Sequence, residues 1–342
     1  MKANQPLKLN RNENPYGPAP AVMRAIKNFP RQHAFMYLKG YYNSRLVGEI
    51  SRQFKVTEDR IILYYGIEDF IRNLFGQLNP QKDSILTNEN CFAYFDIFAA
   101  FKKIKIHHFK LYKKGQAFES DIVDCLSKIK KYRPKVVIIT TPNNPTGHQT
   151  SFKDIERIIK ATPRDSYLLI DETYFGLYPN TGERMFRKIL NQYPNVAFLR
   201  TFSKFYGLAG LRVGFGFCGQ GFKKMIDYNH RFLNFSRVLE EAGIAALKSK
   251  TFYRKVSQKI CRDRDWFIKK VNQLEHFRAY KSAGNFVLVE SFPRKIRLLE
   301  RAKENQKIII WKSLNKKSFR VSIGLSLHVK LLLGLLKKID AK

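Results

Sequence analysis

Lys204 lies among aromatic and aliphatic neighbours in the segment Thr201–Gly216 (TFSKFYGLAGLRVGFG). Apolar surroundings disfavour the charged form of an amine, so they lower its pKa and make it a better nucleophile for Schiff-base chemistry. Thr201, Ser203 and Arg212 are close to it in the chain and suited to hold a phosphate. A reactive lysine beside a phosphate site is what pyridoxal 5′-phosphate (PLP) requires.

Two other places in the chain have the residue types that such a site needs. Asp171 ends the apolar run YLLID, and α/β proteins bind ligands at the carboxyl ends of buried strands. Gly66, Ile67 and Glu68 follow another apolar run and open a helical pattern. Backbone N–H groups at the start of a helix bind phosphate without help from side chains, so these three residues are candidates for their amides.

The Lys204 segment resembles the cofactor-lysine motif of the fold-type I PLP-dependent aminotransferases, and within them it is most similar to the histidinol-phosphate aminotransferase branch. Four other segments agree and occur in the order of the family: Asn10–Gly17 (NRNENPYG), Pro142–Gly147 (PNNPTG), Asp171–Tyr174 (DETY) and Phe319–Gly324 (FRVSIG). The resemblance implies an α/β fold in which a large domain, with a mainly parallel seven-stranded sheet flanked by helices, is joined to a small α+β domain. It also implies a homodimer with shared active sites.

The resemblance assigns roles around the cofactor ring. Lys204 would be the Schiff-base lysine and, once released, the general base. Asp171 would keep the pyridine nitrogen protonated, while Tyr174 and Asn144 would contact the 3′-oxygen. Phe92 matches the aromatic residue that stacks on the ring.

The cofactor phosphate is expected to meet Gly66, Ile67, Glu68, Thr201, Ser203 and Arg212. The resemblance adds Tyr37, which would reach the phosphate of the partner subunit, although Leu38 stands where the family has proline.

The substrate end of the site departs from the family. Arg320 matches the arginine that clamps the substrate anion, because a guanidinium offers a bidentate fork to carboxylate or phosphate. Histidinol-phosphate enzymes carry a second arginine on the preceding strand, where this chain has Trp311 or Lys312. Tyr16 is expected to close over the substrate, and Asn144 to contact it.

The elements that position these residues follow from the apolar pattern. Short apolar runs, typical of strands buried on both faces, alternate with amphipathic stretches as far as about residue 237. Seven strands are expected: Ile61–Tyr65, Ser84–Thr87, Ile104–Phe109, Val136–Thr140, Tyr167–Asp171, Val196–Arg200 and Val213–Cys218. Helices are expected at Asp69–Gln77, Phe92–Lys102, Asp121–Lys131 and Phe152–Ala161.

The C-terminal part follows another pattern. A helical stretch from Val238 to Glu275, three short strands and a terminal helix predict the smaller domain. The expected division is an N-terminal arm over residues 1–30 that joins the small domain, a large domain over 31–237 and a small domain over 238–342.

Composition limits the class of protein. The four cysteines have no CxxC spacing, and neither an apolar leader nor an apolar run of about 20 residues is seen. These features favour a cytoplasmic protein outside the membrane. The net charge of +35 is spread along the chain without a nucleic-acid-binding motif, which favours a solvated basic surface over nucleic-acid binding. It should attract phosphorylated substrates. No metal site is indicated, because His107 and His108 are adjacent on a strand and point to opposite faces.

These observations predict a PLP-dependent aminotransferase that moves an amino group, with glutamate as donor, to a small phosphorylated ketone. A smaller ketone such as dihydroxyacetone phosphate and a decarboxylase of phosphorylated amino acids remain as alternatives, as does a PLP-fold protein that binds nucleic acid as a regulator. The formal GxGxxG pattern at Gly214–Gly219 lies inside an apolar run, which argues against a dinucleotide site.

Overall fold

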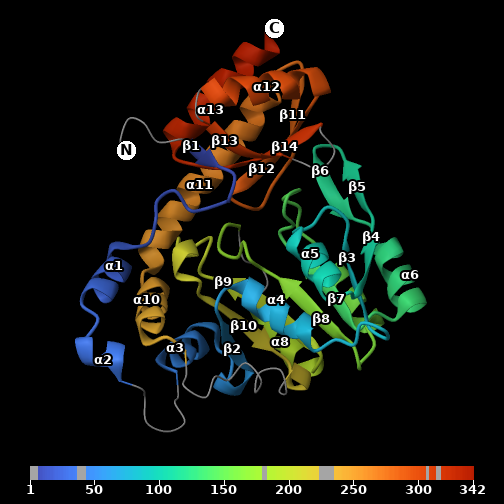
Figure 1. The fold of residues 1–342 in the computed structure, drawn as a ribbon, viewed down its shortest axis with the longest axis vertical. Helices are drawn as coiled ribbons and strands as arrows, with labels where there is room; N and C mark the ends of the chain where they lie inside the picture. The colour runs from blue at the N-terminus through green and yellow to red at the C-terminus, as the bar shows by residue number, and fades with distance from the viewer. Residues whose placement is uncertain (1–6, 37–43, 179–182, 223–234, 306–307, 313–316) are drawn as a thin grey trace.

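Two sheets organise the chain, one in a large unit and one in a smaller unit above it (Figure 1). The computed structural model describes residues 7–36, 44–178, 183–222, 235–305, 308–312 and 317–342. Over these ranges, no helix is both long enough and apolar enough to cross a membrane.

The large sheet has seven strands, which are, in sheet order, β2 (Ile61–Tyr64), β10 (Gly214–Cys218), β9 (Val196–Thr201), β8 (Tyr167–Asp171), β7 (Val136–Thr140), β3 (Ser84–Asn88) and β4 (Lys105–Phe109). β10 is antiparallel to both its neighbours and the other pairs are parallel, so the expected mainly parallel sheet is confirmed. The carboxyl ends of β3, β7, β8 and β9 therefore meet at one edge, the edge where sheets of this kind bind ligands.

Both faces of this sheet are covered by helices. Side chains alternate along each strand, so that Leu168 and Ile170 face one hydrophobic core and Leu169 faces the other. The first core is covered by α1 (Pro20–Lys27), α3 (Arg45–Phe54), α6 (Ile122–Tyr132), α7 (Phe152–Ala161), α8 (Glu183–Gln192) and α10 (Arg237–Lys248). The second is covered by α4 (Ile67–Gly76) and α5 (Tyr94–Phe101), and the short α2 (Arg31–Phe35) follows α1.

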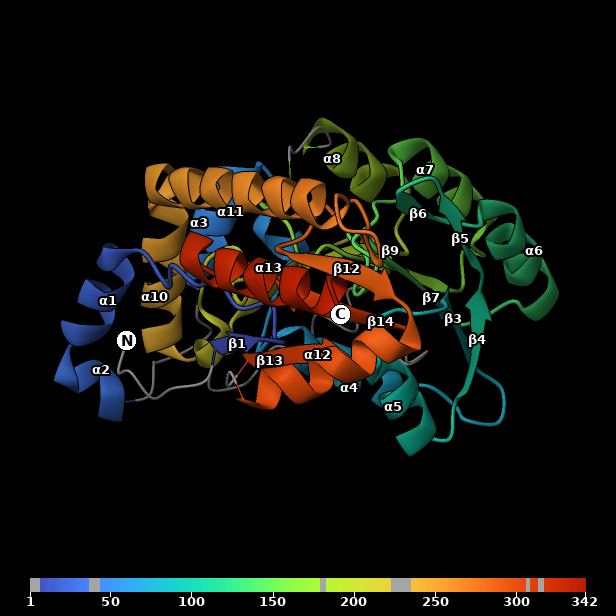
Figure 2. The same cartoon turned by 90° about the horizontal axis from the view of Figure 1, so that it is seen from above.

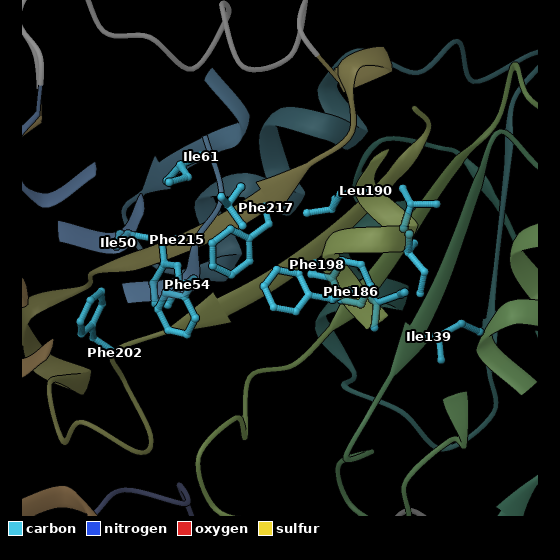
Figure 3. Packing of buried hydrophobic residues seen from close by; sticks show 14 of the residues in the cluster. Ile50, Phe54, Ile61, Ile139, Phe186, Leu190, Phe198, Phe202, Phe215 and Phe217 are labelled. Atoms are coloured by element: carbon cyan, nitrogen blue, oxygen red, sulfur yellow. The ribbon is translucent and has the colours of Figure 1, made fainter. Parts of the chain in front are cut away.

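Phenylalanines fill the first core. Phe217 of β10 lies 5.3 Å from Phe54 of α3 and 5.1 Å from Phe186 of α8, measured between ring centroids, and Figure 3 shows these rings converging between the strands and the helices. On the opposite face of β10, a side chain at Gly214 would run into the ring of Tyr64 on β2. The GxGxxG glycines thus allow close packing within the sheet.

The small sheet has five strands, in the order β1 (Leu7–Leu9), β13 (Ile308–Lys312), β14 (Ser318–Ser322), β12 (Phe286–Ser291) and β11 (Phe277–Ala279). β1 joins it in parallel with β13, which ties the N-terminal arm to this unit. Three helices, α11 (Lys250–Val271), α13 (Ser326–Asp340) and α12 (Pro293–Asn305), lie side by side in that order (Figure 2).

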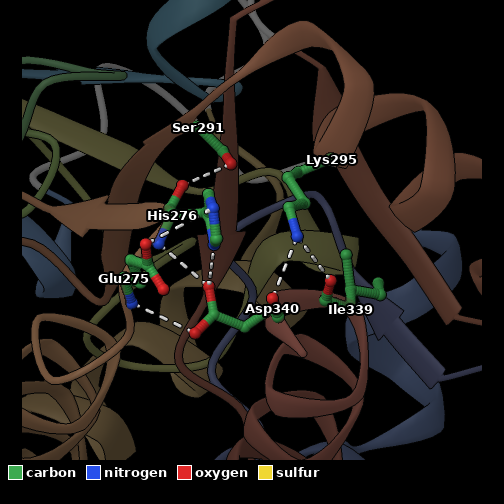
Figure 4. A network of polar contacts seen from close by, with 6 residues as sticks. All are labelled: Glu275, His276, Ser291, Lys295, Ile339 and Asp340. Atoms are coloured by element: carbon green, nitrogen blue, oxygen red, sulfur yellow. Dashed lines mark hydrogen bonds and ion pairs between the residues drawn. The ribbon is translucent and has the colours of Figure 1, made fainter. Parts of the chain in front are cut away.

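A polar cluster holds the end of α13 against the small unit (Figure 4). The Asp340 carboxylate accepts the backbone amides of Glu275 and His276 at 3.0 and 2.9 Å, and it pairs with the His276 ring. Nζ of buried Lys295 donates to the last carbonyls of the helix, those of Ile339 and Asp340, at 3.1 and 2.9 Å. Two of the carbonyls left free at the C-terminus of α13 thereby gain a donor.

The structure differs from the sequence prediction in several short elements. The single helix expected from Val238 is two helices, α10 and α11, that meet at Ser249, and the second ends at Val271. β1 and β11 have three residues each, too few for a periodic signal. The domain boundaries stay predictions, and α10 supplies Ala242 and Ala246 to the large core.

The hairpin formed by β5 (Leu111–Lys114) and β6 (Ala117–Ser120) was also missed, and it bridges the two units. Lys113 pairs with Glu290 of β12 at 2.7 Å, and the Phe118 ring packs on Tyr280 at 4.6 Å. Its two strands pair with each other across Gly115 and Gln116, whereas the contacts that hold it in place come from the small unit.

Candidate functional site

Lys204 follows β9 in a loop that begins at the ligand edge of the large sheet. Its Nζ donates a hydrogen bond to the backbone carbonyl of Arg11, 2.8 Å away. Burial lowers the pKa of Lys204 to about 8, and the Arg320 guanidinium adds to this effect. The amine is therefore easier to deprotonate than an ordinary lysine.

Asp171 is buried at the end of β8. Its Oδ1 accepts the amide and the hydroxyl of Thr173 at 2.9 and 2.7 Å. Burial raises the pKa of Asp171 to about 6, while the bonds from Thr173 oppose that rise. A positively charged partner would favour the anion, so the carboxylate is suited to hold a protonated ring nitrogen.

Tyr174 lies on the turn after Asp171 and is buried. Its hydroxyl oxygen accepts a hydrogen bond from Nδ2 of Asn12, 2.9 Å away. Burial raises the pKa of Tyr174, and Arg320 opposes the rise, so the phenol keeps its proton near neutral pH. Since the oxygen accepts from Asn12, its hydrogen can be donated to a ligand.

Arg320 is 5 % exposed, and three elements hold it. Nη1 donates to Oδ1 of Asn144, on the turn after β7, and Nη2 donates to the carbonyl of Asn10. The Trp311 and Phe286 rings lie 5.1 and 5.7 Å from the guanidinium carbon. Nε is buried and has no hydrogen-bond partner among the described residues. The result is a fixed cation close to the reactive amine.

A chain of polar side chains fixes the turn that carries Asn144. Nδ2 of Asn143 donates to Oγ1 of Thr146, 2.7 Å away. The same Oγ1 lies 2.7 Å from Nδ1 of His148. The other ring nitrogen of His148 lies 3.0 Å from Oγ of Ser120. Burial lowers the pKa of His148 to about 4, so the ring is neutral and can donate from one nitrogen and accept at the other.

Gly66 and Arg212 form a small cradle at the N-terminus of α4. Gly66 caps the helix with a φ of 76°, in the region that favours glycine. A Cβ at Gly66 would lie 2.5 Å from Nη2 of Arg212. The amides of Ile67 and Glu68, in the first turn, have no acceptor within the helix. The cradle thus combines helix-terminal amides with a guanidinium, the donors that a phosphate needs.

Thr201 and Ser203 are buried and lie just before Lys204 in the chain. Oγ1 of Thr201 lies 2.9 Å from Oγ of Ser203 and accepts the Ser203 amide at 3.0 Å. These bonds turn the chain sharply after β9.

The remaining predicted residues are less closely tied to this cluster. Phe92 is half-buried and stacks on Tyr94, with ring centroids 5.0 Å apart. Burial raises the pKa of Cys91, the residue before Phe92, and the Asp171 carboxylate adds to the rise. The loop that carries Phe92 therefore lies near this carboxylate. Tyr16 lies with its ring 5.5 Å from Nζ of Lys259 on α11, among contacts outside the Arg320 pocket. Tyr37 lies outside the described residues.

Sequence reasoning missed the structural part played by the arm itself. The backbone carbonyls of Asn10 and Arg11 accept from Arg320 and Lys204, and Asn12 donates to Tyr174. The arm was singled out as a motif, but a carbonyl acceptor leaves no residue-type signal.

The site fits PLP on the evidence of its donors. The absence of a Cβ at Gly66 lets the Arg212 guanidinium lie close to the N-terminus of α4, and Arg320 keeps an unpartnered buried Nε. Asp171 supplies an anion at the carboxyl end of β8, the position expected for a carboxylate that binds the ring nitrogen.

Known proteins agree with this arrangement. The family model for aminotransferase class I and II matches residues 4–329. The histidinol-phosphate aminotransferase of Methanocaldococcus jannaschii is 29 % identical over 99 % of this chain and 90 % of its own length, and that of Oleidesulfovibrio alaskensis is 30 % identical over 94 % and 84 %. Among solved structures, histidinol-phosphate aminotransferase from Sinorhizobium meliloti in complex with pyridoxal-5′-phosphate superposes with a TM-score of 0.85 at 22 % identity, covering 98 % of this chain and 92 % of that one. The chain belongs to the class I and II aminotransferases and is a PLP-dependent enzyme.

Proposed function

We propose that the protein transfers an amino group, with glutamate as donor, to a small phosphorylated ketone, as in histidinol-phosphate aminotransferases. The observation that carries the proposal is the buried Arg320 guanidinium, held by Asn144 and close enough to Lys204 to lower its pKa. A fixed cation beside the reacting amine would bind the anionic group of a substrate. The relatives named histidinol-phosphate aminotransferase support a phosphorylated substrate.

Around the cofactor, the chain would divide its tasks as follows. Bound PLP supplies an aldehyde and an electron-withdrawing ring. Lys204 would hold it covalently, Asp171 would hold the proton on its ring nitrogen, and Phe92 would stack on the ring. Tyr174 and Asn144 would contact its 3′-oxygen. The phosphate would meet Gly66, Ile67, Glu68, Thr201, Ser203 and Arg212.

Proton transfer then falls to Lys204. With a pKa of about 8, its Nζ can take a proton from the substrate Cα near neutral pH, since a general base works best when its pKa is close to the working pH. Arg320 and Asn144 would orient the substrate so that Cα faces this amine. Tyr16 would have to leave Lys259 to close over the substrate.

One observation favours a smaller acceptor than imidazole acetol phosphate. Trp311 lies opposite Arg320 across the strand pair, and its ring covers the guanidinium at 5.1 Å. Trp311 and Lys312 are the candidates for the position at which histidinol-phosphate enzymes carry a second arginine. With the indole there, a bulky ring would replace a fixed cation beside Arg320. Both acceptors carry the same phosphate, so Arg320 could clamp either, and the bulk of the ring favours the three-carbon ketone dihydroxyacetone phosphate.

The proposal includes a cytoplasmic homodimer in which Tyr37 reaches the partner's cofactor phosphate. Large apolar side chains support such a contact, because Met23, Phe35 and Met36 are 53 %, 71 % and 55 % exposed next to the segment that carries Tyr37. Light scattering on the purified protein would give the mass of a dimer, and a monomer at micromolar concentration would contradict this part.

The function can be tested with the absorbance spectrum of the holoenzyme. Glutamate should bleach the visible band of the lysine-bound cofactor and produce the near-ultraviolet band of its aminated form. Imidazole acetol phosphate or dihydroxyacetone phosphate should then restore the visible band, whereas their unphosphorylated counterparts should not. Recovery with unphosphorylated 2-oxo acids alone would contradict the phosphorylated substrate, and release of carbon dioxide from a phosphorylated amino acid would identify a decarboxylase.

A further inference from the structure

Arg200 and Glu172 form a buried ion pair next to the site. Arg200 is the second-last residue of β9, and Glu172 follows β8 directly. The two side chains are 1 % and 9 % exposed, and Nε of Arg200 lies 2.7 Å from Oε2 of Glu172. Adjacent residues of an extended chain point to opposite faces, so Glu172 turns away from the face that Asp171 occupies.

Aromatic rings surround the Arg200 guanidinium. Its carbon lies 3.8 Å from the ring centroid of Phe175, and 5.1 to 5.2 Å from those of Phe54, Phe186 and Phe217. The last three belong to the core drawn in Figure 3. Nη1 is buried with no hydrogen-bond partner among the described residues. A charged pair thus lies inside an otherwise apolar core.

Stability does not explain this pair. The desolvation of two charges often exceeds their mutual attraction, so apolar side chains of similar volume would stabilise such a core at least as well. An unpartnered N–H adds to the cost, and in a native protein such a group calls for an explanation. The position of the pair in the fold supplies one.

The pair connects the two strand ends that carry the reactive groups. Glu172 is next to Asp171, and its amide donates to the carbonyl of Leu199 on β9, 2.8 Å away. Its own carbonyl accepts the Phe175 amide at 2.8 Å, which closes the turn that bears Tyr174. Arg200 precedes Lys204 by only four residues.

The same turn also packs against the lysine loop. A Cβ at Gly176 would lie 2.6 Å from the ring of Phe205, the residue after Lys204, so the turn and the loop are in direct contact there. A change at the ion pair would therefore reach both the carboxylate and the lysine.

We propose that Glu172 and Arg200 are a positioning pair that fixes the Asp171 carboxylate relative to the Lys204 amine. The pair touches neither substrate nor cofactor. It acts through the ends of β8 and β9, and Arg200 also neutralises a second carboxylate close to Asp171. The inference rests on the roles proposed above for Asp171 and Lys204.

The test needs a variant that keeps the fold. Changing either residue alone leaves an unpaired buried charge and is expected to destabilise the protein. Glu172→Met with Arg200→Met removes both charges and fills the aromatic core with flexible apolar side chains. The matched control removes another ion pair, Asp124 with Lys128 on α6, by the same two replacements.

The readouts are the pH titration of the visible band in the holoenzyme and the rate at which the cofactor dissociates. The double variant Glu172→Met with Arg200→Met should have a melting temperature close to that of the parent. It should nevertheless shift the midpoint of the titration and release the cofactor roughly tenfold faster, which is the lower end of what supporting partners of ligand groups contribute. The α6 control should show the parental midpoint and rate. Arg200→Lys keeps the charge but not the planar fork, and it should give an intermediate midpoint.

Parental values for both readouts in the double variant and in Arg200→Lys would overturn the proposal and leave a purely structural pair. If the double variant does not fold, Arg200→Lys decides alone, with a parental midpoint counting against the proposal. Persistence of the visible band in Lys204→Ala would instead contradict the proposed role of Lys204. The two failures are therefore distinguishable.

Discussion

Lys204 should show its lowered pKa directly in the protein without cofactor. At pH 7, an amine with a pKa of about 8 is roughly 9 % neutral, whereas an ordinary lysine at 10.5 is roughly 0.03 % neutral, a ratio of about 300. Because only the neutral amine is acylated, trace labelling with acetic anhydride should modify Lys204 far faster than exposed lysines below pH 8, after correction for accessibility. Peptide mass spectrometry across pH 6 to 11 gives the midpoint for each lysine.

Replacement of Arg320 separates the causes of this shift. Burial is the larger cause and remains in Arg320→Met, while the nearby guanidinium, which also lowers the pKa, is removed. The midpoint for Lys204 should therefore rise but stay below that of exposed lysines. Arg157→Met, a change to an exposed arginine on α7, should leave it unchanged. A midpoint near 10.5 in the parent, or one that does not move in Arg320→Met, would refute the account of the reactive amine.

Three other predictions concern the amine, the cradle and the C-terminal cluster. Lys204→Ala should fold with a parental melting temperature but show no visible cofactor band, and a retained band would exclude Lys204 as the covalent anchor. Gly66→Ala should weaken cofactor binding at least tenfold, measured by fluorescence titration, because its Cβ would meet Arg212. Gly115→Ala introduces a similar backbone strain in the β5–β6 turn, has no neighbour within 4 Å and should bind the cofactor normally. Parental affinity in Gly66→Ala would contradict the cradle. Asp340→Asn should lower the melting temperature by a few degrees at pH 7. Burial would raise the pKa of Asp340, but the amides of His276 and Glu275 bring it below 3.8. The stabilisation by the carboxylate is therefore complete above pH 3.8 and is lost as the pH falls through the folded-state pKa. A difference in melting temperature between the parent and Asp340→Asn that stays constant down to pH 2 would contradict this.

The sequence predicts the large sheet well because its signals are local. Strands buried on both faces are continuous apolar runs, and Asp171 could be placed at the ligand edge because it ends one of them. The three-residue strand β1 depends on a partner far away in the chain, as in the pairing of Leu7 with Ile308, and β11 and the strands of the hairpin β5–β6 have only three or four residues each. No periodicity within three or four residues can identify such elements.

The residues of the site also divide into those with a local signal in the sequence and those without one. Residues recognised by their type, such as Lys204 and Arg212, lie in the segment between β9 and β10, and Gly66 has a positive φ. The buried pair of Glu172 and Arg200 gave no signal, because each residue alone is compatible with a solvated position. Only the packing of α3 and α8 against β9 and β10 shows that Arg200 lies in an aromatic core.

The N-terminal arm connects the two reactive ends of the site. Its carbonyls at Asn10 and Arg11 accept from Arg320 and Lys204. Asn12 donates from Nδ2 to the hydroxyl oxygen of Tyr174 and from its backbone N–H to Oγ of Ser322 on β14. Both cations therefore donate to one short backbone segment, which is itself anchored to the small sheet through β1. In the proposed function, a substrate anion at Arg320 would compete with the carbonyl of Asn10, and a covalent bond at Lys204 would remove the donor from Arg11. Binding at either end would then release a bond to the same segment, so the arm is where the proposed anion clamp and the amine would respond to each other.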